Sequence, residues 1–370
     1  MEGSSFIKVT SIINRSYSSM LIDELFKNGI QSVFIEAGRT NILEERKQML
    51  ALGNNKKLIN DPGDILYFLI EKKYEPNIMD FMDQVLDLSN PGKATVFSTD
   101  INLIDSNNEI FHNKSANFNQ NTPFEAYNDL CGISCIVQRS QGDNLARLIL
   151  DSGISVPVTT YGTGTGVRDK LGLLRITIPA EKEIITLITS KADADAVMEL
   201  MIAEGNLSQP GKGFIYTFPV LSGYVNTKIS RGETGQVASF EQVIAAIDSL
   251  KGNIEWRSSQ IAHKKSQKLV FLSDLTELNL ICNEGYASDL MKIAMENGAP
   301  GATVSTLKFK TSLETTKYLP SREICKMIVG TNNVQQIADA LKNADAFSDE
   351  SQALLYSQSV GRAFTYLGKS

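Results

Sequence analysis

Short apolar runs alternate with amphipathic stretches along the chain, and this alternation recurs three times. The stretches "SIINRSYSSMLIDELFKNGI" (11–30), "CIVQRSQGDNLARLILDSGI" (135–154) and "LICNEGYASDLMKIAMENGA" (280–299) each open with an apolar strand and a polar turn. Each continues as an amphipathic helix and ends on a glycine suited to a helix C-cap, namely Gly29, Gly153 and Gly298. The pattern therefore predicts three copies of one unit.

A second landmark keeps nearly the same distance from each of these glycines. Glycine–basic turns begin at Gly92, Gly211 and Gly361, which lie 63, 58 and 63 residues further on. The intervals are each predicted to hold a second strand (32–36, 156–161, 302–307), a loop, a third strand (64–71, 173–179, 325–330) and a second helix (77–88, 193–205, 333–344). A fourth strand is predicted to start at the turn. This βαββαβ order is that of the ferredoxin-like unit, whose helices cover one face of a four-stranded antiparallel sheet.

The other face of each predicted sheet, away from the helices, is also expected to carry apolar residues, namely Val9, Ile136 and Ile281. Three such sheets can cover one another by facing inward around a pseudo-threefold axis. The alternative is three separate units in a row, which leaves each second face wet. We expect the packed α+β arrangement, with repeats at 1–120, 121–252 and 253–370. The polar stretch 106–129 and residues 239–268, with a helix at 239–250, are predicted to connect them.

Charge and composition argue against several classes of function. The net charge of −6 argues against nucleic-acid binding, and neither a membrane-spanning run nor a signal peptide is recognisable, so we expect a cytoplasmic protein. The two histidines, His112 and His263, lie in polar stretches, and the four cysteines lack zinc-ligand spacing. We therefore expect no enzyme, no metal and no cofactor.

The second repeat carries three motifs in line. They are "GISVPVTTYGTGTG" (153–166), "PGKGFIYTFPV" (210–220) and "KISRGETGQVA" (228–238), and the third repeat adds "GAPGATV" (298–304). These stretches resemble the flexible-loop base, B-loop and C-loop motifs of the PII nitrogen-regulatory signalling family, whose members are homotrimers of a ferredoxin-like subunit. The chain thus looks like three PII-like units fused into an intramolecular pseudo-trimer, which acts as a monomer.

The resemblance implies that an adenine nucleotide such as ATP, ADP or AMP binds in a cleft between units and that the loops then regulate a protein partner, whose identity is unknown. The implied ligand contacts are Lys212 with the backbone of Gly211 and Gly213 at the phosphates, Lys228 and Arg231 from the C-loop, Gly164 and Gly166 at the loop base, Thr303 at the nucleotide base, and Arg139 at the exit of the first strand.

The chain also departs from the family. Arg168 stands where the family has a glutamine that helps hold Mg and 2-oxoglutarate, which leaves 2-oxoglutarate sensing open. The loop of the second repeat is short (167–172), and the first and third repeats lack a recognisable C-loop. We therefore expect one good site, in the second repeat.

Two alternatives remain at this point. In the first, the recurring glycine turns are purely structural and only lead into a strand. A structural turn, however, needs no basic residue such as Lys93, Lys212 or Arg362. A protein that keeps the trimer-like shell as a scaffold, without any ligand, would also show degenerate sites.

Overall fold

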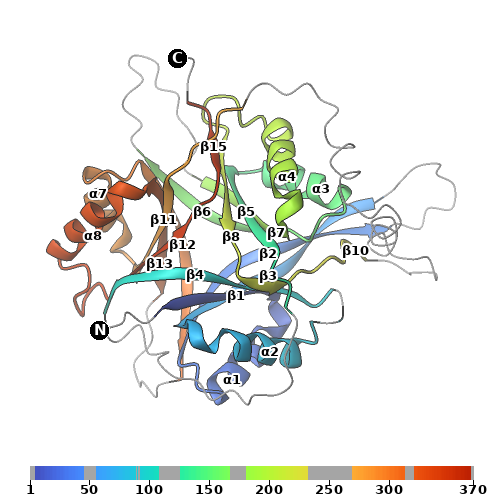
Figure 1. Ribbon diagram of the computed structural model, residues 1–370, viewed down its shortest axis with the longest axis horizontal. Coiled ribbons are helices and arrows are strands. Elements are labelled where there is room, and N and C mark those ends of the chain that lie inside the picture. The colour runs from blue at the N-terminus through green and yellow to red at the C-terminus, as the bar shows by residue number, and fades with distance from the viewer. Residues whose placement is uncertain are drawn as a thin grey trace.

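The computed structural model describes residues 5–45, 56–88, 90, 92–107, 126–166, 181–231, 269–312 and 321–367. This part of the chain forms a mixed α+β structure with six α-helices and a 15-stranded sheet (Figure 1). We call its three portions segment I (5–107), segment II (126–231) and segment III (269–367). None of the described helices has the length and apolar character that crossing a membrane requires.

The elements follow the same order in each segment. Segment I holds β1 (Phe6–Asn14), α1 (Ser18–Lys27), β2 (Ser32–Glu45), β3 (Lys56–Glu71), α2 (Glu75–Leu86) and β4 (Ala94–Ser106). Segment II holds β5 (Leu130–Gln138), α3 (Gly142–Asp151), β6 (Val158–Gly166), β7 (Glu181–Ser190), α4 (Lys191–Glu204), β8 (Gly213–Pro219), β9 (Ser222–Tyr224) and β10 (Ser230–Arg231). Segment III holds β11 (Leu275–Asn283), α7 (Ala287–Glu296), β12 (Gly301–Thr311), β13 (Arg322–Gly330), α8 (Val334–Asn343), β14 (Leu354–Ser359) and β15 (Ala363–Thr365).

Strand pairing within each segment is antiparallel and repeats one order. The orders are β2-β3-β1-β4, β6-β7-β5-β8 and β12-β13-β11-β14. In each segment the first strand is therefore central, because it pairs with both the third and the fourth.

The segments exchange strands in a closed cycle. After its fourth strand, segment II adds β9 to β4 of segment I, and segment III adds β15 to β8 of segment II. The last part of β4 in turn pairs with β14 of segment III. The second strands β2, β6 and β12 also pair with one another. Since each segment supplies strands to the others, these edges are covered rather than open.

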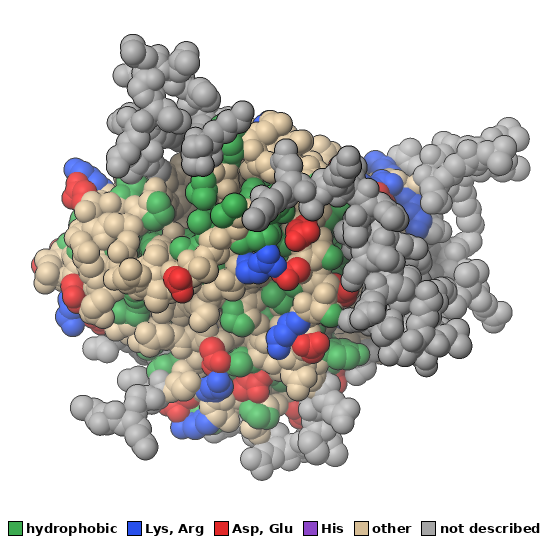
Figure 2. Space-filling model, turned by 45° about the horizontal axis from the view of Figure 1, so that its top comes forward, with side chains coloured by type: hydrophobic (Ala, Val, Ile, Leu, Met, Phe, Trp, Pro, Cys, Tyr) green, Lys and Arg blue, Asp and Glu red, His purple; other side chains and the backbone are tan. Residues whose placement is uncertain are grey.

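The apolar core has a central part that all three segments share. Its members lie on the inner sheet faces and include Phe34, Tyr67, Tyr216, Phe218, Leu307 and Tyr356. Three further clusters lie between each sheet and its two helices, which lie on the outside in Figure 1. The segments therefore pack around a common centre instead of standing in a row. On the face shown in Figure 2, basic and acidic side chains lie interspersed.

Three details of the predicted layout are wrong. Val9 faces the helices, while Ile12 of the same strand faces the centre. The third strand of segment II is β7, whose run Ile184–Ile188 is buried except at Thr186, and not 173–179, which lies outside the described residues. The fourth strand of segment III starts at Leu354, so Gly361 follows it and leads into β15.

The first helix of each segment is held at its start by an acid from the third strand. Such a carboxylate accepts hydrogen bonds at the positive end of the helix dipole, which stabilises the helix. The contacts are Ser18 Oγ to Asp64 Oδ2 at 2.6 Å, Gly142 N to Glu183 Oε2 at 2.7 Å and Ala287 N to Glu323 Oε2 at 3.2 Å.

Charged groups also lie at the centre of the molecule. Lys8 Nζ donates to Gln358 Oε1 at 3.0 Å and lies 5.7 Å from the centre of the Tyr356 ring. Burial lowers the pKa of Lys8 to about 8, while the charge of Glu277 opposes the shift and that of Lys326 adds to it. The folded state therefore disfavours the protonated amine.

We expect stability to rise with pH between about 8 and 10.5 because of Lys8. The unfolded chain keeps the lysine proton up to about pH 10.5, whereas the folded chain releases it near pH 8. Replacing Lys8 with methionine should stabilise the protein at pH 7 by at most about 3 kcal/mol and remove this rise. Urea unfolding of both proteins from pH 7 to 10 measures the difference, and parallel curves would contradict the expectation.

Candidate functional site

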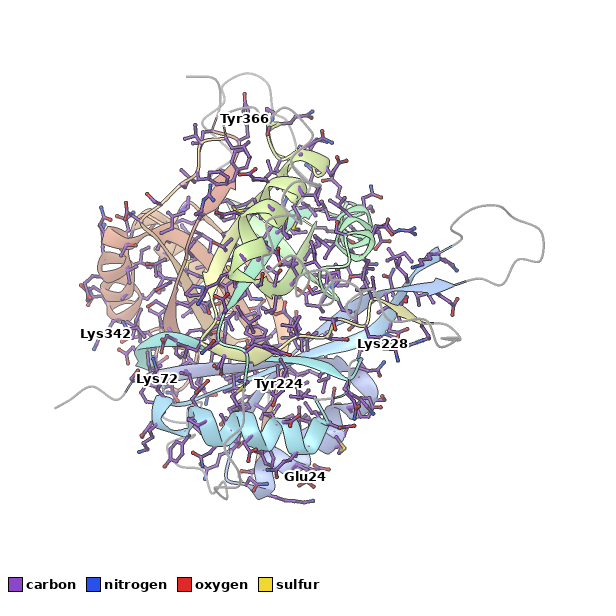
Figure 3. All side chains as sticks on the ribbon, turned by 45° about the vertical axis from the view of Figure 1, so that its right-hand side comes forward. Glu24, Lys72, Tyr224, Lys228, Lys342 and Tyr366 are labelled. Carbon is purple, nitrogen blue, oxygen red and sulfur yellow. The ribbon has the colours of Figure 1, made fainter. Side chains whose placement is uncertain are left out.

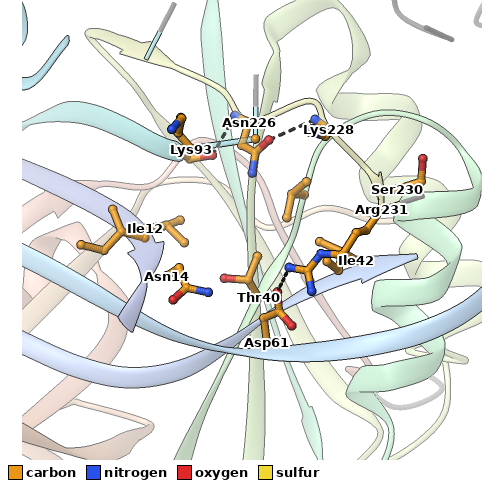
Figure 4. A pocket seen from close by; sticks show the side chains of 14 residues that line it. Ile12, Asn14, Thr40, Ile42, Asp61, Lys93, Asn226, Lys228, Ser230 and Arg231 are labelled. Atoms are coloured by element: carbon orange, nitrogen blue, oxygen red, sulfur yellow. Dashed lines mark hydrogen bonds and ion pairs between the residues drawn. The ribbon is translucent and has the colours of Figure 1, made fainter. Parts of the chain in front are cut away.

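A pocket of 210 Å³ lies where segment I meets the last strands of segment II (Figure 4). Its lining mixes basic, polar and aliphatic side chains. The lining residues are Ile12, Ile13, Asn14, Thr40, Ile42, Asp61, Gly92, Lys93, Thr95, Val156, Asn226, Lys228, Ser230 and Arg231.

The turn before β4 forms one wall of the pocket. Gly92 has a φ of +99°, which favours glycine, and a Cβ there would lie 2.6 Å from Cδ of Lys228. The next residue, Lys93, is exposed. Glycine thus lets the turn form and lets a second cationic side chain approach its backbone closely.

The strand exchange brings Lys228 and Arg231 to this turn. After β8 the chain crosses to segment I, where Tyr224 of β9 pairs with Val96. It then runs along β2, where β10 pairs in parallel and places Arg231 beside Glu44. Figure 3 shows Lys228 beside the strands of segment I. Three cations therefore meet at a boundary between segments, and Lys93, Lys228 and Arg231 are all exposed.

One carboxylate shares the pocket with these cations. Asp61 of β3 forms an ion pair with Arg231, in which 19% of the aspartate side chain and 58% of the arginine side chain is exposed. The guanidinium is therefore held at the rim of the pocket but stays open to solvent.

The predicted phosphate turn of segment II lies elsewhere. Gly211 has a φ of +69°, and its carbonyl accepts a hydrogen bond from Gln138 Nε2 at 2.9 Å. A Cβ on Gly213 would lie 2.5 Å from the Ile136 carbonyl oxygen, so this glycine is needed for packing against β5. Lys212 is half-buried and does not line the described pocket. A substitution at Gly213 should therefore disturb the packing of the fold, and a loss of ligand binding in such a variant would not identify a ligand contact.

The remaining predicted residues lie at the contact between segments II and III. Gly164 pairs with Thr303, and Gly166 pairs with Gly301. Thr303 is buried, while Arg139 is exposed and donates to both carboxylate oxygens of Glu181 at 2.7 Å. The structure thus brings Gly164 and Thr303 together, but not with Lys228 and Arg231. Arg168 and the loop 167–172 lie outside the described residues.

Segment III has an arginine where segment I has a glycine beside the pocket. Gly63 is the partner of Asn14 in β1, and Arg322 is the partner of Asn283 in β11. The Arg322 side chain is 2% exposed, lies 5.1 Å from the Phe309 ring centre and donates to Gln352 Oε1 at 2.7 Å. At the corresponding position of segment I, a Cβ on Gly63 would lie 2.8 Å from Thr40 Oγ1.

Sequence reasoning gave little weight to Lys93 and missed Asp61, Thr40 and Asn226. The glycine–lysine pair at 92–93 was the sequence signal for this site, but no motif near it indicated that segment II supplies the other cations.

Among the described residues, no group of His, Cys, Asp and Glu could hold a metal ion. The four cysteines are free, and burial raises the pKa of the half-buried Cys131 thiol to about 11. Neither a protein-family model nor a curated protein sequence matches the chain.

Proposed function

We propose that the chain is a non-enzymatic regulatory protein that binds a small phosphorylated metabolite between segments I and II. In this proposal the segments are three ferredoxin-like units arranged as a PII-like pseudo-trimer, and the ligand is an adenine nucleotide. The repeated strand order and the closed strand exchange support this arrangement.

The observation that carries the proposal is the meeting of Lys93, Lys228 and Arg231 around one pocket. With Asp61 counted, these groups leave the pocket a formal charge of +2, and an anion bound there offsets that charge. The positive-φ turn at Gly92 adds backbone that an anion can approach closely. A purely structural turn would not explain the two cations that segment II contributes.

Regulation would use the long hairpin of β2 and β3. Asp61 lies on this hairpin and already holds Arg231, while Arg147 of α3 donates to the Lys56 carbonyl oxygen at 2.7 Å. A ligand that draws Arg231 away from Asp61 would change how the hairpin is held, and a protein partner would sense the difference. We propose that this occurs in the cytoplasm.

A scaffold without ligand is the second candidate. Arg322 favours it for segment III, because a buried arginine pairs with Asn283 there, whereas Gly63 pairs with the pocket residue Asn14 in segment I. A thermal-shift screen with ATP, ADP, AMP, cyclic AMP and 2-oxoglutarate separates the two functions. A ligand at 100 times its Kd stabilises by about 2.7 kcal/mol, and no response to any compound would favour the scaffold.

We expect Lys93→Ala to weaken ATP binding about 10- to 100-fold, because it removes one charge-assisted contact. Lys212→Ala is the matched variant, since it removes the lysine of the corresponding glycine–lysine turn in segment II. Calorimetry on both variants locates the site. A loss with Lys212→Ala alone would place the ligand at the turn of segment II, as the sequence motifs imply.

A further inference from the structure

Three side-chain acceptors of the pocket already accept hydrogen bonds within the protein. Asn14 Oδ1 accepts from the amide of Ser16 at 3.0 Å, Thr95 Oγ1 from the amide of Asn226 at 2.9 Å, and Asn226 Oδ1 from the amide of Lys228 at 3.0 Å. These bonds hold the turns that shape the pocket. A base that needs an acceptor for its exocyclic amino group would have to compete with them.

The charged groups of the pocket are mostly donors. Lys93, Lys228 and Arg231 carry three positive charges, and Asp61 carries one negative charge, which leaves a formal charge of +2. Ammonium and guanidinium groups donate hydrogen bonds and accept none. They suit phosphate oxygens, and a chain of two or three phosphates offers more of these than a single phosphate does.

The pocket is also small for a whole nucleotide. Its 210 Å³ lies below the lower end, about 300 Å³, of pockets that enclose drug-sized ligands. When the cations hold the phosphates, the apolar groups of the lining that remain for the rest of the ligand are Ile12, Ile13, Ile42 and Val156. Aliphatic walls of this kind discriminate weakly between similar groups.

We infer that the pocket recognises a polyphosphate chain and does not select the base attached to it. This inference rests on the proposed function and narrows it: the ligand class is compounds with two or three linked phosphates. Affinity should then increase from AMP to ADP to ATP, because each added phosphate brings more charge to the same cations.

Calorimetry with ATP, GTP, CTP, sodium tripolyphosphate and adenosine tests the inference on the full chain. We expect Kd values for the three triphosphates within about threefold of one another, displacement of ATP by tripolyphosphate, and no binding of adenosine. Binding of ATP more than about tenfold tighter than GTP and CTP, or failure of tripolyphosphate to displace it, would overturn the inference and leave the proposed function standing. Binding of none of these compounds would overturn both.

A variant pair checks that the cations act on the phosphates. Lys93→Ala should weaken ATP and tripolyphosphate by the same factor, because both are held by the same group. Lys72→Ala is the control, since this exposed lysine pairs with Asp100 and does not line the pocket. Weakening of ATP alone by Lys93→Ala would show that the tripolyphosphate binds elsewhere and would contradict a shared phosphate site.

Discussion

Replacing Lys326 with methionine is expected to destabilise the protein by about 3–5 kcal/mol. Lys326 Nζ lies 2.8 Å from Glu36 Oε2, and only 3% of the glutamate side chain is exposed. The pair joins β13 of segment III to β2 of segment I across the centre of the molecule. Methionine keeps much of the side-chain volume but leaves the carboxylate buried without its counter-charge, and that loss dominates the effect.

The electrostatics of Lys326 agree with a pair that stabilises the fold. Burial disfavours its charge, but the charge of Glu36 and its hydrogen bond outweigh this and raise the pKa of the lysine. The contribution is therefore complete below the unfolded pKa of 10.5 and is lost only as the pH rises beyond it. At neutral pH the substitution should show its full cost.

Urea unfolding at pH 7 measures this loss of stability. Two further variants serve as controls for it. Lys342→Met breaks an exposed pair with Asp105, at 3.4 Å, and should change stability by no more than about 1 kcal/mol. The double variant Lys326→Met, Glu36→Leu should recover most of the loss, because it removes both buried charges. A loss below about 1 kcal/mol in Lys326→Met would mean that Glu36 reaches water in the folded state.

Replacing Phe34 with alanine should cost about 3–5 kcal/mol and should weaken the packing of the segments on one another. The Phe34 ring is 1% exposed. It stacks on Tyr67 of its own segment at a centroid distance of 5.4 Å and meets Phe309 of segment III at 5.1 Å. Truncation leaves a cavity at the shared centre and removes both aromatic contacts.

Calorimetric unfolding tests the role of Phe34 in the shared core. If the three segments unfold together, the whole transition should move to lower temperature. Tyr17→Ala is the control, because this side chain is 40% exposed and its loss should cost no more than about 0.5 kcal/mol. A new low-temperature step that involves segment I alone would show that the centre does not couple the segments.

Local signals in the sequence were sufficient for most elements. Apolar stripes at helical spacing and cap glycines predicted the six described helices. Bounds were predicted for the second helix of each repeat, and these agree to within a few residues, as for the helix predicted at 77–88 and observed at Glu75–Leu86. The prediction failed where a local signal was ambiguous. Gly361 and Arg362 look like the turn before a fourth strand, but the apolar run of β14 begins earlier. The strand that follows Arg362 is β15, which pairs with β8 of segment II.

The candidate site was predicted less well than the fold, and for a physical reason. Lys228 and Arg231 were recognised as cations of the second repeat, together with Lys212. Their position depends on β9 and β10, which pair with β4 and β2 of segment I. Such pairing joins residues more than a hundred positions apart, and no pattern inside one repeat encodes it.

The sequence by itself determined the three-fold recurrence of strands and helices, because periodicity and turn chemistry act over a few residues. Only the tertiary structure decided which cations share a pocket, since side chains from different segments meet only when the strand exchange closes. It also decided that Glu36 and Lys326 neutralise each other at the centre and that Arg322 is buried beside Phe309 and Gln352. These contacts depend on the packing of three sheets on one another, and the sequence pattern within a single repeat does not encode that packing.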